Sequence, residues 1–79
     1  MTTPRMLAAI DAMDRLLPAP TKSQLRALES RGCASWGDYI AEKAKEHGIR
    51  VAQAYDLFVL LGTEEAFDGF PSHLAGALP

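Results

Sequence analysis

Glycine and proline residues cut this chain into short segments, and each segment spaces its apolar residues as an α-helix does. Pro18 and Pro20 cannot continue a helix, while Gly32, Gly48 and Gly62 each follow a run of helical periodicity. The segments between these stops are joined by short connections, as in small helical proteins. This pattern of helical segments and helix-terminating residues predicts an all-α chain.

The first helix is expected to begin at Pro4, because proline suits the first turn of a helix and Thr3 can serve as its N-cap. It should end at Leu16 or Leu17, before the two prolines. Its buried stripe is expected to be Met6, Ile10, Met13 and Leu17.

Two capping-box patterns predict where the second and third helices begin. Thr21 stands three residues before Gln24, and Ser35 stands three residues before Asp38. Each helix should then end before the next glycine stop. The expected buried positions are Leu25 and Leu28 in the second helix, and Trp36, Ile40 and Ala44 in the third.

A fourth helix is expected over residues 51–61. Its second half, Leu57–Leu61, is apolar nearly all round, which predicts an enclosed, central helix. A strand is the alternative for Leu57–Leu61, but the helical lead-in and the lack of a second strand candidate favour a helix.

Residues 63–65 (Thr-Glu-Glu) are a favourable helix start, because their acids suit the positive end of the helix dipole. Gly69 and Pro71 should interrupt that segment. Ser72 is then expected to cap a last short helix that reaches Leu78.

Length and composition predict one small domain over residues 1–79. The chain is 48% hydrophobic and 23% charged, as folded proteins are, so we expect a small bundle of four main helices plus a short C-terminal helix. Cys33 is the only cysteine, which excludes a disulfide within the chain. Together with His47 and His73 it does not give the paired spacing of a zinc site, so no metal or cofactor is expected. Because so small a core is stabilised neither by a disulfide nor by a metal ion, a homodimer is expected.

No apolar run is longer than the five residues of Leu57–Leu61, far fewer than the roughly 20 that span a bilayer. No membrane segment is therefore expected. The N-terminal residues lack the apolar stretch of a secretory signal. With the lone thiol, this points to the cytoplasm.

The region around Gly48 resembles the helix-turn-helix of DNA-binding regulators. Ala44 stands four residues before the glycine and Ile49 follows it, while Ala54 and Leu57 are apolar six and nine residues later. In that family the small alanine lets two helices cross closely, and the glycine makes the sharp turn. The resemblance covers residues 40–60 and implies a helix-turn-helix-like hairpin over 36–61.

The sequence departs from the helix-turn-helix pattern at several positions. Lys43 and His47 stand where family members place apolar residues, and Arg50 and Val51 stand where the second helix is usually capped by Ser or Thr. A plain α-hairpin with a glycine stop is therefore the alternative interpretation.

Basic and amide side chains near this hairpin are the candidate DNA contacts. Only Arg50 and Gln53 of the would-be recognition helix are typical base readers, whereas Asp56 would repel phosphate. An isoelectric point near 5.5 is also low for a DNA-binding domain. The full set of candidates is Lys22, Arg26, Arg31, Arg50 and Gln53.

The C-terminal region carries a different candidate surface. All eight Lys and Arg lie within residues 1–50, and residues 51–79 hold four acids. Phe67 and Phe70 lie in a short, broken segment, and they either close the end of the core or form an exposed patch that docks a partner. The candidate partner surface is Phe67, Phe70, Glu64 and Glu65.

Two functions follow from these surfaces. The first is a small, non-catalytic protein-interaction or regulatory module, and the alternative is a helix-turn-helix transcriptional regulator. A protein partner is favoured over nucleic acid because of the acidic balance. Cys33 could serve as a nucleophile near a helix start, but a small buried cysteine is the more common situation, so no enzyme activity is expected.

Overall fold

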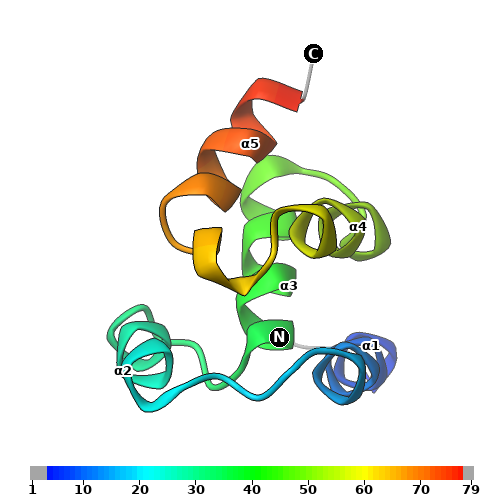
Figure 1. Cartoon of the computed structure of the whole chain (residues 1–79). Coiled ribbons are helices and arrows are strands. Elements are labelled where there is room, and N and C mark those ends of the chain that lie inside the picture. The colour runs from blue at the N-terminus through cyan, green and yellow to red at the C-terminus, as the bar shows by residue number, and fades with distance from the viewer. Residues whose placement is uncertain (1–3, 78–79) are drawn as a thin grey trace. The chain divides into compact units, whose positions relative to one another are not determined.

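The computed structural model describes residues 4–77, without the side chains of Glu65 and Ala77. This part of the chain forms five α-helices and one 3-10 helix and contains no strand. Figure 1 shows the course of the chain through these elements. The predicted all-α class, with four main helices and a short C-terminal one, is confirmed. The elements are α1 (Pro4–Leu16), α2 (Lys22–Ser30), α3 (Trp36–His47), α4 (Val51–Leu61), η1 (Thr63–Glu65) and α5 (Gly69–Ala77).

The chain divides into two units, Met1–Ala41 and Glu42–Pro79. The boundary falls inside α3, so this helix contributes its first half to one unit and its second half to the other. The first unit also holds α1 and α2, and the second holds α4, η1 and α5.

In the first unit, α1 crosses the start of α3 at very short range. A Cβ atom added to Gly37 would lie 2.5 Å from the backbone oxygen of Ile10 and 2.8 Å from an Asp14 carboxylate oxygen. That carboxylate accepts a hydrogen bond of 2.8 Å from the Gly37 backbone N–H. The position therefore has room for glycine alone, and the contact satisfies one of the backbone donors that every helix start exposes.

The predicted capping box of α2 is confirmed. The Thr21 backbone donates to Gln24 Oε1 at 2.9 Å, and the Gln24 backbone donates to the Thr21 hydroxyl at 3.2 Å. At the end of α2 the Cys33 backbone N–H donates a hydrogen bond of 2.9 Å to the Leu28 carbonyl. This bond spans Gly32, where the helix was predicted to end. Leu28 and Cys33 are both buried.

The prediction that Leu25 is buried is wrong, because its side chain is exposed. The helix is only nine residues long, and its buried face is centred between Ala27 and Leu28. Leu25 falls at the edge of that face.

The capping box predicted for α3 is present in a shifted form. The Asp38 backbone donates to the Ser35 hydroxyl at 3.2 Å as expected, but the Asp38 carboxylate accepts from Ala34 at 2.9 Å rather than from Ser35. Trp36 is 1% exposed, so its predicted burial is confirmed. Its ring meets that of Tyr39 edge to face, with ring centroids 6.3 Å apart.

In the second unit, α4 packs against α5. The rings of Phe58 and Phe70 meet edge to face with centroids 5.1 Å apart, and both side chains are fully buried. Ala54 and Leu74 are buried as well. Because Phe58 lies one turn after Ala54 and Leu74 one turn after Phe70, each helix gives one side to this small core.

The structure corrects two expectations about the C-terminal region. The α5 helix begins at Gly69 rather than after Ser72, and Pro71 lies in its first turn, where a missing N–H costs nothing. Ser72 is not a cap, since its hydroxyl donates to the Asp68 carbonyl at 3.2 Å. Residues 63–65 form the single 3-10 turn η1. Thr3 and Leu78 lie outside the described residues.

Candidate interaction surface on α4

A three-residue turn, residues 48–50, joins α3 to α4. The Ile49 backbone N–H donates to the Ala44 carbonyl at 3.0 Å, and the Gly48 N–H donates to the Lys45 carbonyl at 3.2 Å. This pair of bonds is a Schellman motif, and Gly48 takes the positive φ of 65° that it requires. Ala44 and Ala54, the small residues on either side of the turn, are both buried.

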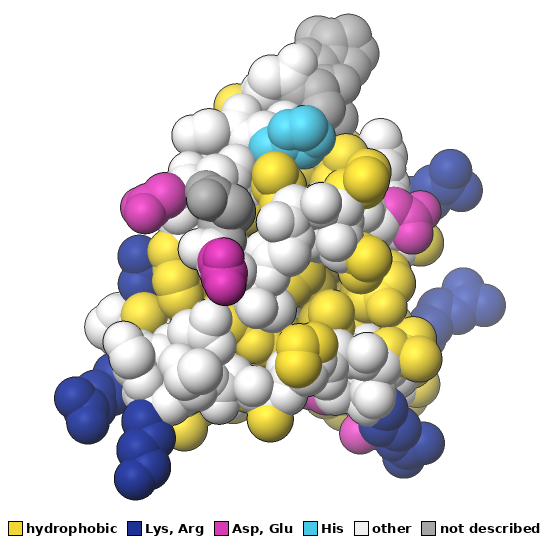
Figure 2. All heavy atoms as spheres, in the orientation of Figure 1, with side chains coloured by type: hydrophobic (Ala, Val, Ile, Leu, Met, Phe, Trp, Pro, Cys, Tyr) yellow, Lys and Arg dark blue, Asp and Glu magenta, His cyan; other side chains and the backbone are white. Residues whose placement is uncertain are grey.

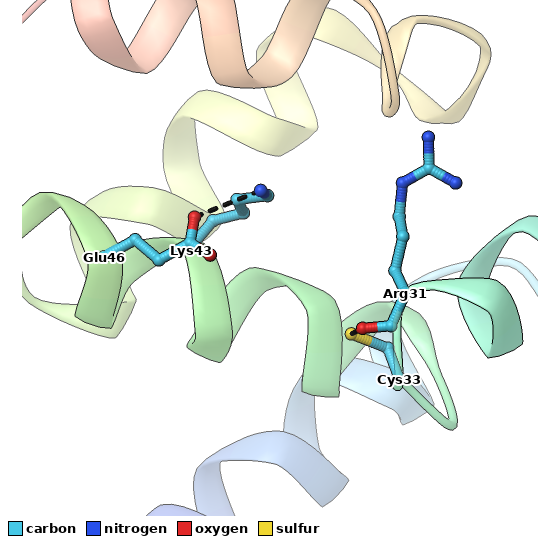
Figure 3. A network of polar contacts seen from close by, with 4 residues as sticks. All are labelled: Arg31, Cys33, Lys43 and Glu46. Carbon is cyan, nitrogen blue, oxygen red and sulfur yellow. Dashed lines mark hydrogen bonds and ion pairs between the residues drawn. The ribbon is translucent and has the colours of Figure 1, made fainter.

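Lys43 departs from the helix-turn-helix pattern, and the structure gives it a surface role. Its ammonium pairs with the Glu46 carboxylate at 3.1 Å, one turn further along α3 (Figure 3). His47, the other departure in this helix, is half-buried.

One side of α4 is exposed along its length. Five side chains share it, and we call them the α4 face: Ala52, Gln53, Asp56, Val59 and Leu60. At about 3.6 residues per turn these positions fall on one half of the helix, opposite Ala54 and Phe58. Figure 2 shows hydrophobic side chains reaching the surface over α4.

The exposure of the α4 face contradicts the expectation of an enclosed helix. Leu60 is 79% exposed and Val59 is 51% exposed. An all-apolar run carries no polar residue to mark its outer side, so periodicity over Leu57–Leu61 could not orient it. Asp56 was the available signal, because residues three and four positions after an exposed carboxylate share its side of a helix.

The electrostatics of the α4 face follow from the uneven charge of the chain. Asp56 lies at the centre of the face, and Glu64 and Asp68 are exposed further along the same unit. Residues 51–79 contain four acids and no Lys or Arg. Arg50, exposed at the start of α4, is the last cation of the sequence, and its side chain makes no cap hydrogen bond.

All five candidate DNA contacts are exposed, but they divide between the two units. Lys22, Arg26 and Arg31 belong to the first unit, whereas Arg50 and Gln53 belong to the second. The Arg31 guanidinium donates to the Ala27 carbonyl at 2.9 Å, so it helps to close the end of α2. Ala52, Gln53 and Asp56 of α4 are exposed.

The candidate partner surface around Phe67 and Phe70 needs correction. Phe70 is fully buried against Phe58, so the alternative interpretation, that it closes the core, holds for this residue. Phe67 is half-buried and Glu64 is exposed, while the side chain of Glu65 is outside the described part. The error arose because α5 begins earlier than expected, which places Phe70 on the side that faces α4.

Cys33 is buried, and its thiol lies 3.8 Å from the Arg31 carbonyl oxygen (Figure 3).

Among residues 4–77 no group of three or more His, Cys, Asp or Glu side chains is placed to hold a metal ion. Within the same residues no helix has both the length and the apolar character needed to cross a membrane. Comparisons with protein-family models, curated proteins and solved structures found no significant match.

Proposed function

We propose that this chain is a non-catalytic protein-interaction module that binds a partner through the α4 face. The observation that carries the proposal is the exposure of Leu60, 79%, beside Val59 on a helix that buries Ala54 and Phe58 on its opposite side. Covering a leucine or valine side chain contributes roughly 1.5–3 kcal/mol. A partner that covers both side chains therefore gains much of the binding free energy that a moderate affinity requires.

The arrangement of the apolar residues distinguishes the α4 face from ordinary surface leucines. Leu7 and Leu16 of α1 are also exposed, at 57% and 72%. They are nine residues apart, which places them on opposite sides of a helix with about 3.6 residues per turn. Single exposed leucines of that kind need no functional explanation. Val59 and Leu60 are adjacent and continue the surface of Ala52, so they form one patch.

DNA binding by a helix-turn-helix is the second candidate. Its support is the three-residue turn at Gly48, the buried alanines on either side of it, and the exposed Arg50 and Gln53. In that arrangement α4 would be the recognition helix. Asp56 at the centre of the exposed side would face phosphates and repel them, which ranks this candidate below protein binding.

Site-specific photo-crosslinking tests the proposal. A photoreactive amino acid replaces Gln53, on the α4 face, in the full chain expressed in its native host. We expect a covalent adduct with another protein, and Leu60→Ser should suppress it several-fold because the serine removes the exposed leucine.

The control is Leu16→Ser, which alters an equally exposed leucine outside the patch and should leave the adduct unchanged. No protein adduct from position 53, or an adduct that Leu60→Ser leaves intact, would contradict the proposal. An adduct with DNA would favour the helix-turn-helix instead.

A further inference from the structure

The α4 face has the shape of a helical ridge, and this restricts what can cover it. Val59 and Leu60 lie two turns from Ala52, and Asp56 lies one turn from it, so the exposed residues form a stripe along the helix. Such ridges pack into the grooves of another helix. An extended peptide would need a sheet edge to pair with, and residues 4–77 contain no strand. The surface is therefore suited to a helix.

The position of Asp56 argues against a second copy of this chain as the occupant. Asp56 is the middle residue of α4, which runs from Val51 to Leu61. If two copies paired through this face about a two-fold axis at the middle of α4, the same carboxylate from each would meet at the centre of the contact. Like charges placed opposite each other at a closing interface repel, so this pairing is disfavoured.

The surrounding charge selects the chemistry of the partner helix. Asp11 pairs with Arg15 and Glu46 pairs with Lys43, whereas Asp56 forms no ion pair among residues 4–77. With four acids and no Lys or Arg, residues 51–79 carry a formal charge of −4. A partner that brings lysines or arginines beside an apolar stripe matches both properties, whereas an acidic helix or a nucleic acid is repelled.

Resting on the proposed function, we propose that the partner of the α4 face is a basic amphipathic helix. Its apolar stripe covers Val59 and Leu60, and a Lys or Arg of its flanking positions lies beside Asp56. The apolar contact supplies most of the affinity. The charges set the choice of partner, because exposed ion pairs add little binding energy but disfavour partners of the wrong sign.

The test uses three synthetic helical peptides with one leucine stripe and with Lys, Gln or Glu at the flanking positions. Binding to the full chain is measured by fluorescence anisotropy at low and at high salt. We expect the Lys peptide to bind roughly tenfold or more tightly than the Glu peptide at low salt, with a smaller ratio at high salt. Asp56→Asn should narrow that ratio, and Asp56→Lys should reverse the preference.

Two further variants separate this inference from the proposed function. Leu60→Ser should abolish binding of the Lys peptide, while Leu16→Ser should leave it unchanged; circular dichroism checks that each variant is folded. If the three peptides bound equally and Leu60→Ser abolished that binding, the preference for a basic partner would be wrong. The α4 face would still be a docking surface. Absence of any binding that depends on Leu60 would overturn both. Binding of duplex DNA, or self-association through Leu60, in place of peptide would overturn the basic helix.

Discussion

The carboxylate of Asp14 in α1 accepts a hydrogen bond of 2.8 Å from the backbone N–H of Gly37, in the first turn of α3. The two residues are 23 positions apart, so the bond ties distant segments of the first unit together. It places a negative charge at the positive end of the α3 dipole, where it is favourable. The same contact leaves no room for a side chain at Gly37.

Gly37→Ala should destabilise the protein, although the same change inside a helix usually stabilises it by roughly 0.5–1 kcal/mol. The added Cβ would lie 2.5 Å from the Ile10 carbonyl oxygen, so the two helices must move apart. Forced overpacking of this kind costs about 1–3 kcal/mol. Gly76→Ala in α5 is the matched control, since nothing lies within 4 Å of its Cβ position. Urea denaturation measures both, and equal stability of the two variants would show that the close approach is absent.

Asp14→Ala should lower the free energy of unfolding by about 0.5–2 kcal/mol, because it removes a capping acceptor from the start of α3. Asp14→Asn keeps an acceptor oxygen and should lose less. The control is Asp11→Ala, which removes an exposed ion pair of 2.8 Å with Arg15 and should cost less than about 1 kcal/mol. If thermal melting ranked Asp11→Ala as the more damaging change, the capping role of Asp14 would be wrong.

Trp36→Ala should cost roughly 3–5 kcal/mol, because the indole is almost completely buried and contacts Tyr39 edge to face. A small domain has little stability to spare, so a largely unfolded variant is expected. Leu16→Ala, at an exposed position, should change stability by less than about 0.5 kcal/mol. Circular dichroism during chemical denaturation compares the two, and a Trp36→Ala variant as stable as the parent would place Trp36 at the surface.

Random duplex DNA should bind more weakly than micromolar at physiological salt. The affinity of DNA-binding proteins rests chiefly on phosphate neutralisation by Lys and Arg, and Arg50 is the last of these in the chain, six residues before Asp56. A titration of labelled duplex at two salt concentrations measures this. Nanomolar binding that weakens steeply with salt and falls on Arg50→Ala would establish the helix-turn-helix in place of the interaction module.

The start of α2 and the end of α3 were predictable because local chemistry determines them. Thr21 with Gln24 began α2 as the capping box requires, and Gly48 ended α3 through a Schellman turn. These signals act within a few residues, so they do not depend on the rest of the fold. The tie between Asp14 and Gly37 joins residues far apart in the sequence, and no local pattern predicts it.

The orientation of the apolar residues was less predictable than the helices themselves. Phe70 was a candidate for partner docking because its helix was expected to begin later, and Leu60 was expected to be enclosed because its neighbours are apolar. Which side of α4 is covered depends on where α5 packs. The polar and charged positions of the α4 face, Gln53 and Asp56, were predictable, because their exposure follows from their own chemistry.

Chemical-shift mapping of the full chain with the Lys-flanked leucine peptide locates the residues that the peptide contacts. We predict that the methyl resonances of Val59 and Leu60 shift together as the peptide is added, while those of Leu7 and Leu16 stay in place. Shifts that centre on α1, or none at Val59 and Leu60 although the peptide binds, would contradict the assignment of the α4 face as the interaction surface.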